Sequence, residues 1–241
     1  LLKISKTTPE NTGNAIGEWL KENVAEIAAY NTVKGFLNLS FSTVYWNGLF
    51  EQIASAEDFG QLPATGRTIM VEYSSPNTNK PLHLGHIRNN LLGWSVAKLL
   101  EVCGHNVMKV NLVNDRGIHI CKSMYAWKVL GNGETPASSG KKGDHLVGDY
   151  YVAFNNLYKK EVDELVAGGM TKEEAEKNAP SLKAAQEMLF KWENGDAEVV
   201  ELWKTMNGWV YEGFDKTYND LGISFDRTYY ESQTYLFGKA L

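Results

Sequence analysis

The feature that most constrains the fold is a strand–helix–strand pattern near the middle of the chain. Residues 68–73 predict a strand, a polar loop with two prolines follows, and 86–103 carry apolar residues at helical spacing. Gly104 then suits a helix C-terminus, and 107–113 predict a second strand. This order is typical of a βαβ unit, so the sequence favours the α/β class with a parallel, doubly wound sheet.

The segments before and after this βαβ unit also carry patterns that predict helices and strands. Thr8-Pro9-Glu10 predicts a helix start, and apolar residues continue at helical spacing as far as Ile27. A strand at 36–41 and a short helix at 44–53 are expected next. Toward the C-terminus we expect three helices, at 146–166, 171–193 and 196–220, and a strand at 223–225. The predicted domains are a small α/β unit at 1–60, a first half of the sheet domain at 61–130, a mainly helical insertion at 131–221, and a return to the sheet at 222–241.

Composition narrows the class of protein. The chain has 241 residues, of which 43% are hydrophobic and 12% aromatic, enough for a folded core. It contains no apolar run long enough for a membrane helix. Two cysteines, Cys103 and Cys121, cannot build a disulfide framework or a zinc ribbon, and a reducing cytoplasm is expected. The first residue is not Met, so a piece of a longer chain is also expected.

Charge is distributed unevenly. The net charge is −5, yet residues 61–118 hold six basic and three acidic side chains. A locally positive segment inside an acidic protein favours binding of a small polyanion, such as a nucleoside triphosphate. It speaks against a protein that coats nucleic acid.

The most informative motif is His83-Leu84-Gly85-His86, which follows the polar loop at the predicted helix start. Helix N-termini favour anions, glycine allows close approach of a ligand, and two imidazoles can stabilise a phosphate whose charge grows in a transition state. Two other interpretations remain open from the residues alone. The histidines could only cap or pack the helix, or H-x-x-H could bind zinc, for which Cys103 and His105 stand a helix away; we expect no metal.

The motif and its surroundings are similar to a known family. His83-Leu84-Gly85-His86 resembles the HIGH signature of class I aminoacyl-tRNA synthetases, and the segment from Ser75 to Arg88 closely resembles arginyl-tRNA synthetase. The resemblance continues at 113–117 and 225–232, and so covers most of the chain. It implies a Rossmann-like class I catalytic core with a helical insertion, preceded by part of a small α/β N-terminal domain that contacts tRNA.

The resemblance also implies roles for individual residues. His83, Gly85 and His86 would hold ATP and stabilise its α-phosphate under attack, and Lys80 would supply phosphate charge. Glu72, Ser75 and Asn77 match positions that bind arginine. Each also has a structural interpretation: Glu72 could pair with Arg67 or Arg88, Ser75 and Asn77 suit any turn, and Lys80 could be a solvated charge.

Several further residues are weighed as structural. Asp115 and Arg116 are balanced between function and an ordinary surface turn. The aromatic residues of 146–220 predict core packing, and Glu231 and Ser232 carry little signal. Three histidines are expected to be structural: His105, His119 and His145.

The resemblance implies ligation of L-arginine to tRNA(Arg) through an arginyl-adenylate, with ATP and Mg²⁺, in a monomeric cytoplasmic protein that does not enter a membrane. A KMSKS-like signature, a Tyr-x-x-x-Asp element and a helical C-terminal domain are not found, so the 241 residues are expected to be an internal fragment that is inactive alone. Two alternatives are a small nucleotidyltransferase with a similar H-x-G-H, which would carry it near the N-terminus, and a non-catalytic ligand- or tRNA-binding module.

Overall fold

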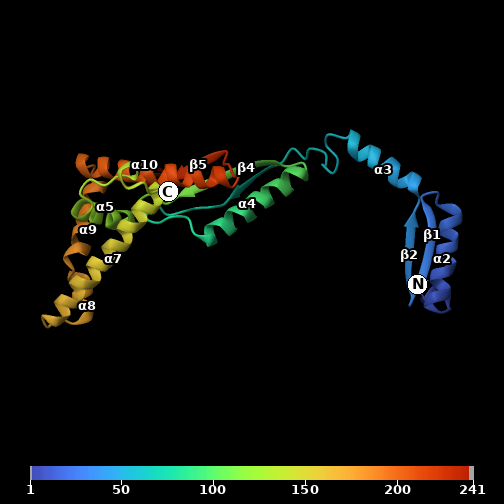
Figure 1. Ribbon diagram of the computed structural model, residues 1–241, viewed down its shortest axis with the longest axis horizontal. Coiled ribbons are helices and arrows are strands. Elements are labelled where there is room, and N and C mark those ends of the chain that lie inside the picture. The colour runs from blue at the N-terminus through green and yellow to red at the C-terminus, as the bar shows by residue number, and fades with distance from the viewer. Residues whose placement is uncertain (1, 239–241) are drawn as a thin grey trace. The chain divides into compact units, whose positions relative to one another are not determined.

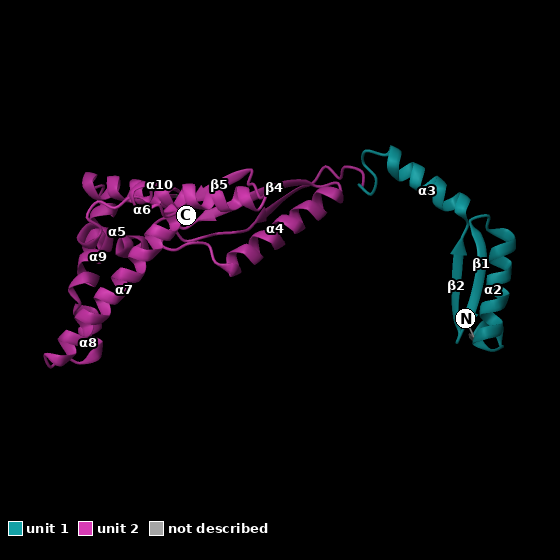
Figure 2. Ribbon diagram, in the orientation of Figure 1, with its two compact units in different colours: residues 1–61 teal, residues 62–241 magenta. Residues whose placement is uncertain are grey.

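A computed structural model describes residues 2–238 and divides the chain into two compact units, Leu1–Gln61 and Leu62–Leu241 (Figure 2). Among the helices of the described residues, none is both long and apolar enough to cross a membrane.

The first unit is a helix packed on a two-stranded hairpin. Its elements are α1 (Leu2–Ser5), α2 (Pro9–Asn23), β1 (Ile27–Val33), β2 (Phe36–Phe41) and α3 (Thr43–Ser55) (Figure 1). The predicted helix start is confirmed, because the Thr8 hydroxyl accepts a hydrogen bond from the Asn11 N–H at 3.2 Å. The continuation of this helix to Ile27 is wrong: Ile27 opens β1. Lys34 and Gly35 both have positive φ, which suits a tight hairpin turn and pairs β1 with β2.

The second unit is built on a three-stranded parallel sheet. Strands β3 (Thr68–Glu72), β4 (Asn106–Val113) and β5 (Arg227–Tyr230) lie in the order β3-β4-β5. Helix α4 (Leu84–Val102) connects β3 to β4, so the βαβ unit predicted from the sequence is present. Gly93 allows α4 to approach the end of β3 closely, because a Cβ at this position would lie 2.3 Å from the Tyr73 ring. Much of the helix's apolar face stays exposed, namely Leu91, Leu92, Val96 and Leu99.

A helical segment separates β4 from β5. It contains α5 (Ile118–Leu130), α6 (Pro136–Ser139), α7 (Gly143–Ala167), α8 (Lys172–Asn178), α9 (Pro180–Glu193) and α10 (Ala197–Asp220), and α11 (Glu231–Gly238) follows β5. The sequence predicted α7 and α10 but missed α5. It also joined α8 to α9, which are separate because Pro180 cannot continue a helix hydrogen-bond ladder.

The strand expected at 223–225 is wrong. Ile223 is buried and Phe225 packs against Tyr73, with ring centroids 4.7 Å apart. The return strand begins two residues later, after Asp226 accepts a hydrogen bond from the Lys109 N–H at 2.7 Å and fixes the entry of β5 beside β4.

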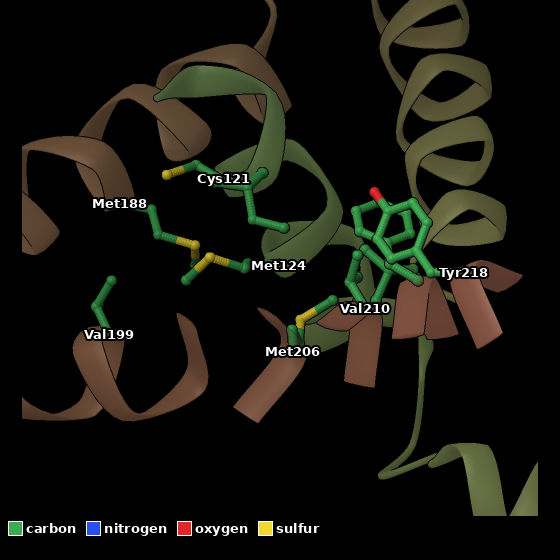
Figure 3. Packing of buried hydrophobic residues seen from close by; sticks show 10 residues of the cluster. Cys121, Met124, Met188, Val199, Met206, Val210 and Tyr218 are labelled. Atoms are coloured by element: carbon green, nitrogen blue, oxygen red, sulfur yellow. The ribbon is translucent and has the colours of Figure 1, made fainter. Parts of the chain in front are cut away.

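The main apolar core lies among these helices (Figure 3). Its buried members come from α5, α7, α9 and α10: Ile120, Cys121, Met124, Val147, Met188, Val199, Met206, Val210, Phe214 and Tyr218. Trp192, Trp203 and Trp209 pack around it, as the prediction of core packing for 146–220 expected, and Trp127 does so too. This helical segment therefore has a hydrophobic core of its own that can hold α10 rigidly against the sheet.

Helices α7 and α10 cross at a close backbone contact. A Cβ on Gly143 would lie 2.0 Å from the Trp209 carbonyl oxygen, whereas a Cβ on Gly208 of α10 would meet nothing within 4 Å.

We expect Gly143→Ala to lower the free energy of unfolding by about 2–3 kcal/mol, because the added methyl group would force the helices apart. Gly208→Ala is the matched control, and it should leave stability unchanged or raise it by up to about 1 kcal/mol through helix propensity. Denaturant unfolding followed by tryptophan fluorescence measures both. Equal effects of the two substitutions would contradict the close crossing.

Candidate active site

The predicted site begins where β3 leaves the sheet. Pairing with β4 is regular as far as Glu72 and Val110, and it resumes at an isolated bridge between Asn77 and Asn114. The Asn114 N–H donates to the Pro76 carbonyl at 2.9 Å, and the Thr78 N–H donates to the Asn114 carbonyl at 3.0 Å. Between these two points, the path from β3 contains one residue more than the path along β4, so the loop must bulge.

Two consecutive serines form the bulge. Ser74 has φ 76° and Ser75 has φ 44°, a region that costs non-glycine residues about 1–3 kcal/mol each. Side chains hold this backbone in place. The Ser74 N–H donates to Asn89 Oδ1 of α4 at 2.6 Å, and the Ser75 N–H donates to Asn111 Oδ1 of β4 at 3.0 Å. The loop is therefore fixed from two neighbouring elements.

The structure brings two of the three predicted substrate residues together. The Ser75 hydroxyl donates to Glu72 Oε1 at 3.1 Å, and both residues are exposed. Asn77 lies deeper, half-buried, and lines a small hollow with Asn114 and His119. The carboxylate of Glu72 is thus oriented by the bulge itself.

The histidine motif begins α4 with an exchange of hydrogen bonds. His83 is the N-cap; its Nδ1 accepts from the Gly85 N–H at 3.1 Å, and its own N–H donates to His86 Nδ1 at 3.2 Å. This is a capping box made of two imidazoles, whose ring centroids lie 4.0 Å apart. A Cβ on Gly85 would lie 2.9 Å from His83 Cε1, so glycine allows the ring to fold back over the helix start.

This cap fixes the tautomer of both histidines. A nitrogen that accepts a hydrogen bond carries no proton, so each neutral ring must hold its proton on Nε2. Burial is the main cause that lowers the pKa of His86, and the electrostatic influence of His83 and Lys80 lowers it further. His86 is therefore neutral at pH 7. The motif offers two Nε2–H donors beside the positive end of a helix dipole, which suits an anion.

Lys80 lies close to this helix start. It is half-buried. Burial lowers the pKa of both His86 and His119, and the charge of Lys80 lowers both further, together with Lys122 in the case of His119. His119 was predicted to be structural; its Nδ1 lies 2.9 Å from the Tyr151 hydroxyl, and it shares a hollow with Asn77. Cationic and N–H donor groups from the loop, α4 and α5 thus surround one region.

One interpretation of the sequence placed Asp115 in an ordinary surface turn, and for Asp115 this interpretation is wrong. It is 1% exposed, and its carboxylate accepts hydrogen bonds from the Tyr211 hydroxyl at 2.9 Å and from the hydroxyl and N–H of Ser232 at 2.7 and 2.8 Å. Its carbonyl accepts from Trp203 Nε1 at 2.7 Å. Asp115 therefore ties the end of β4 to α10 and α11.

Sequence reasoning also missed Asn89 and Asn111, which hold the bulge. A periodicity signal was available for Asn111, because a polar residue stands in the otherwise apolar stretch Val110-Asn111-Leu112-Val113 of a predicted inner strand. Asn89 gave no comparable signal.

A parallel sheet whose first loop enters a helix at an H-x-G-H cap defines a nucleotide-binding domain of the class I tRNA synthetase type. The model of the family described as tRNA synthetases class I (R), catalytic domain, matches residues 51–236. The chain belongs to this family, the arginyl-tRNA synthetase catalytic domain, which confirms the resemblance seen in the sequence.

Individual relatives agree with this assignment. Arginine–tRNA ligase from Bacteroides thetaiotaomicron is 59% identical over 240 residues, which are 99% of this chain and 40% of the relative. The enzyme of the same name from Porphyromonas gingivalis is 54% identical with the same coverage. The solved structure of Thermus thermophilus arginyl-tRNA synthetase superposes with a TM-score of 0.55 over 96% of this chain and 34% of that one, at 20% identity, and so supports the fold. The chain spans about 40% of the length of these curated relatives.

We expect Asp115→Asn to lower the free energy of unfolding by about 2–3 kcal/mol, because the new amide NH₂ would face buried donors. The control is Asp220→Asn, an exposed carboxylate paired with Lys216 at 3.2 Å, which should change stability by less than about 0.5 kcal/mol. Denaturant unfolding compares the two. If Asp115→Asn lowered the free energy of unfolding as little as Asp220→Asn does, the buried hydrogen bonds of Asp115 would not contribute as described.

Proposed function

We propose that the protein containing this chain ligates L-arginine to tRNA(Arg). Family membership and the ligase activity for which relatives at 54–59% identity are named support this proposal. The observation that carries it is the capped helix start, which offers two imidazole Nε2–H donors beside a loop that orients a carboxylate.

The reaction has two steps. A carboxylate oxygen of arginine attacks the α-phosphorus of ATP, the bond to the β-phosphate oxygen breaks, and pyrophosphate leaves with that electron pair, which gives arginyl-adenylate. A terminal ribose hydroxyl of the tRNA then attacks the adenylate carbonyl, loses its proton, and AMP leaves. Both steps need positioning and stabilisation of negative charge on oxygen more than they need covalent help from the protein.

In this proposal His83, Gly85 and His86 bind ATP. The two Nε2–H groups would donate to α-phosphate oxygens as their charge grows, and the absence of a side chain at Gly85 lets the nucleotide approach the helix start. Neutral imidazoles suit this role because each keeps a fixed donor without needing to lose or gain a proton. Lys80 would add a mobile positive charge for the phosphates.

Glu72, Ser75 and Asn77 would bind arginine. Glu72 offers a carboxylate to a cation, and its bond with Ser75 fixes its direction before the substrate arrives. Asn77 lies in the hollow beside Asn114, where its amide can bond to the polar end of an amino acid.

We propose that Mg²⁺ is bound together with ATP. Within residues 2–238, no three His, Cys, Asp or Glu side chains gather in a way that could hold a metal ion. Mg²⁺ binds readily to nucleotide phosphates with few protein ligands, so we assign it no residue of this chain.

We further propose a Rossmann-like core with a helical insertion, in a monomeric cytoplasmic enzyme whose Leu1–Gln61 unit contacts tRNA. The family match favours this ligase over a small nucleotidyltransferase that has the same H-x-G-H.

We expect His86→Ala to slow adenylate formation by about 10²-fold or more in the whole protein. His86→Gln keeps the fold, because glutamine at this position can still close a capping box, and its amide N–H is a donor of different geometry from the imidazole N–H. It should fold as stably as the native protein and be slower than it. The control His145→Ala removes an exposed imidazole of α7 and should leave the rate unchanged. Full activity of His86→Ala in a stably folded protein would contradict the ATP-binding role of His86.

We also expect that removal of Leu1–Gln61 from the whole protein weakens tRNA charging more than it weakens arginine or ATP binding. The H-x-G-H loop and its supporting side chains lie entirely in the other unit. Charging and pyrophosphate exchange should be measured on the same preparation, with tRNA in both assays. Equal losses in all three quantities would place this unit within the catalytic machinery.

A further inference from the structure

Tyr218 of α10 reaches the strained loop from the helical insertion. The residue is 6% exposed, and its hydroxyl oxygen lies 2.7 Å from the Ser74 hydroxyl and 3.4 Å from Asn111 Nδ2. No other side chain of the insertion is hydrogen-bonded to Ser74 or Ser75 among the described residues.

These contacts form one chain of hydrogen bonds with a defined direction. Asn111 Oδ1 accepts from the Ser75 N–H, so its Nδ2 faces Tyr218 and donates to the tyrosine oxygen. The tyrosine proton is then available to the Ser74 hydroxyl. Burial raises the pKa of Tyr218, so the hydroxyl stays protonated and the direction does not change near neutral pH.

This series of hydrogen bonds ends on the groups that the proposed reaction uses. It holds Ser74 and Ser75, which both have positive φ, and Ser75 in turn donates to Glu72. A strained backbone keeps one conformation only while its neighbours hold it, and here one of those neighbours belongs to the insertion. Without the tyrosine hydroxyl, Asn111 and Ser74 would each lose a buried partner, and the loop could relax.

We propose that Tyr218 is a positioning residue for arginine binding, which acts through Ser74 and Asn111 on Ser75 and Glu72. The insertion is thereby coupled to the substrate loop. This inference rests on the proposed function. The role differs from packing, because the ring of Tyr218 contacts Phe225 at 5.1 Å between centroids, and phenylalanine would preserve that contact.

The test is Tyr218→Phe in the whole protein. A matched control exists in the same insertion: Tyr150 is also buried and its hydroxyl donates to Glu134 Oε2 at 2.6 Å, but it has no hydrogen bond to the loop. Steady-state ATP–pyrophosphate exchange, with tRNA present, gives kcat and KM for arginine and for ATP. We expect Tyr218→Phe to raise KM for arginine about 5- to 10-fold, as one lost hydrogen bond would, with KM for ATP and kcat within about twofold. Tyr150→Phe should change none of them.

A second variant and a double mutant exclude a general effect on folding. Ser74→Ala removes the other end of the same bond, so it should raise KM for arginine similarly, and the double variant Ser74→Ala/Tyr218→Phe should be no worse than either single variant. Additive effects, or an unchanged KM for arginine in Tyr218→Phe, would overturn the proposal.

Amide hydrogen exchange at Ser75 gives a readout that does not depend on activity. We expect about 10-fold faster exchange at this amide in Tyr218→Phe and no change in Tyr150→Phe. If native protein shows no arginine-dependent exchange of pyrophosphate, the proposed function fails, and unchanged Ser75 protection would separately reject the coupling through Tyr218.

Discussion

The parallel pairing of β3 with β4 is the constraint on which the site depends. Because the pairing resumes at Asn77 and Asn114 with one residue to spare, the backbone between them must leave the ladder. Its N–H groups then need partners other than the backbone carbonyls of the ladder, and asparagine side chains of α4 and β4 accept hydrogen bonds from them. A bulge that is costly in itself becomes a rigid support for Ser75 and Glu72. Backbone strain here is maintained by neighbouring polar groups, and we infer that this serves positioning.

The helix start that follows uses a second local device. Most helices cap their first N–H groups with hydroxyl or carboxylate oxygens, whereas α4 uses imidazole nitrogens. The exchange consumes both Nδ1 atoms and leaves both Nε2–H groups outward. Helix capping and the proposed anion recognition can thus both follow from one arrangement, in which a Cβ at Gly85 would displace His83. A structural role for the motif does not exclude the proposed functional one.

Local patterns predicted much of this architecture, and long-range contacts limited the rest. The alternation of apolar residues gave β3, α4 and β4, and the histidine motif lies at the start of α4, as the sequence predicted. The turn at Lys34-Gly35 that creates β1 and the break at Pro180 had recognisable residues but were overlooked. Asp115 could not be placed from sequence, because its partners Tyr211 and Ser232 lie about a hundred positions away. The same holds for Tyr218 and Ser74, whose meeting depends on how α10 packs.

The central claim is that the capped helix start holds two imidazoles whose Nδ1 atoms accept hydrogen bonds and whose Nε2–H groups are available as donors. Two-dimensional NMR of ¹⁵N-labelled histidine rings measures this directly, because the two ring nitrogens differ in chemical shift according to which carries the proton. We predict the Nε2–H tautomer for both His83 and His86, and a neutral ring at pH 7 for His86, because burial lowers the pKa of His86. Detection of the Nδ1–H form, or of a protonated imidazolium at His86, would contradict the account.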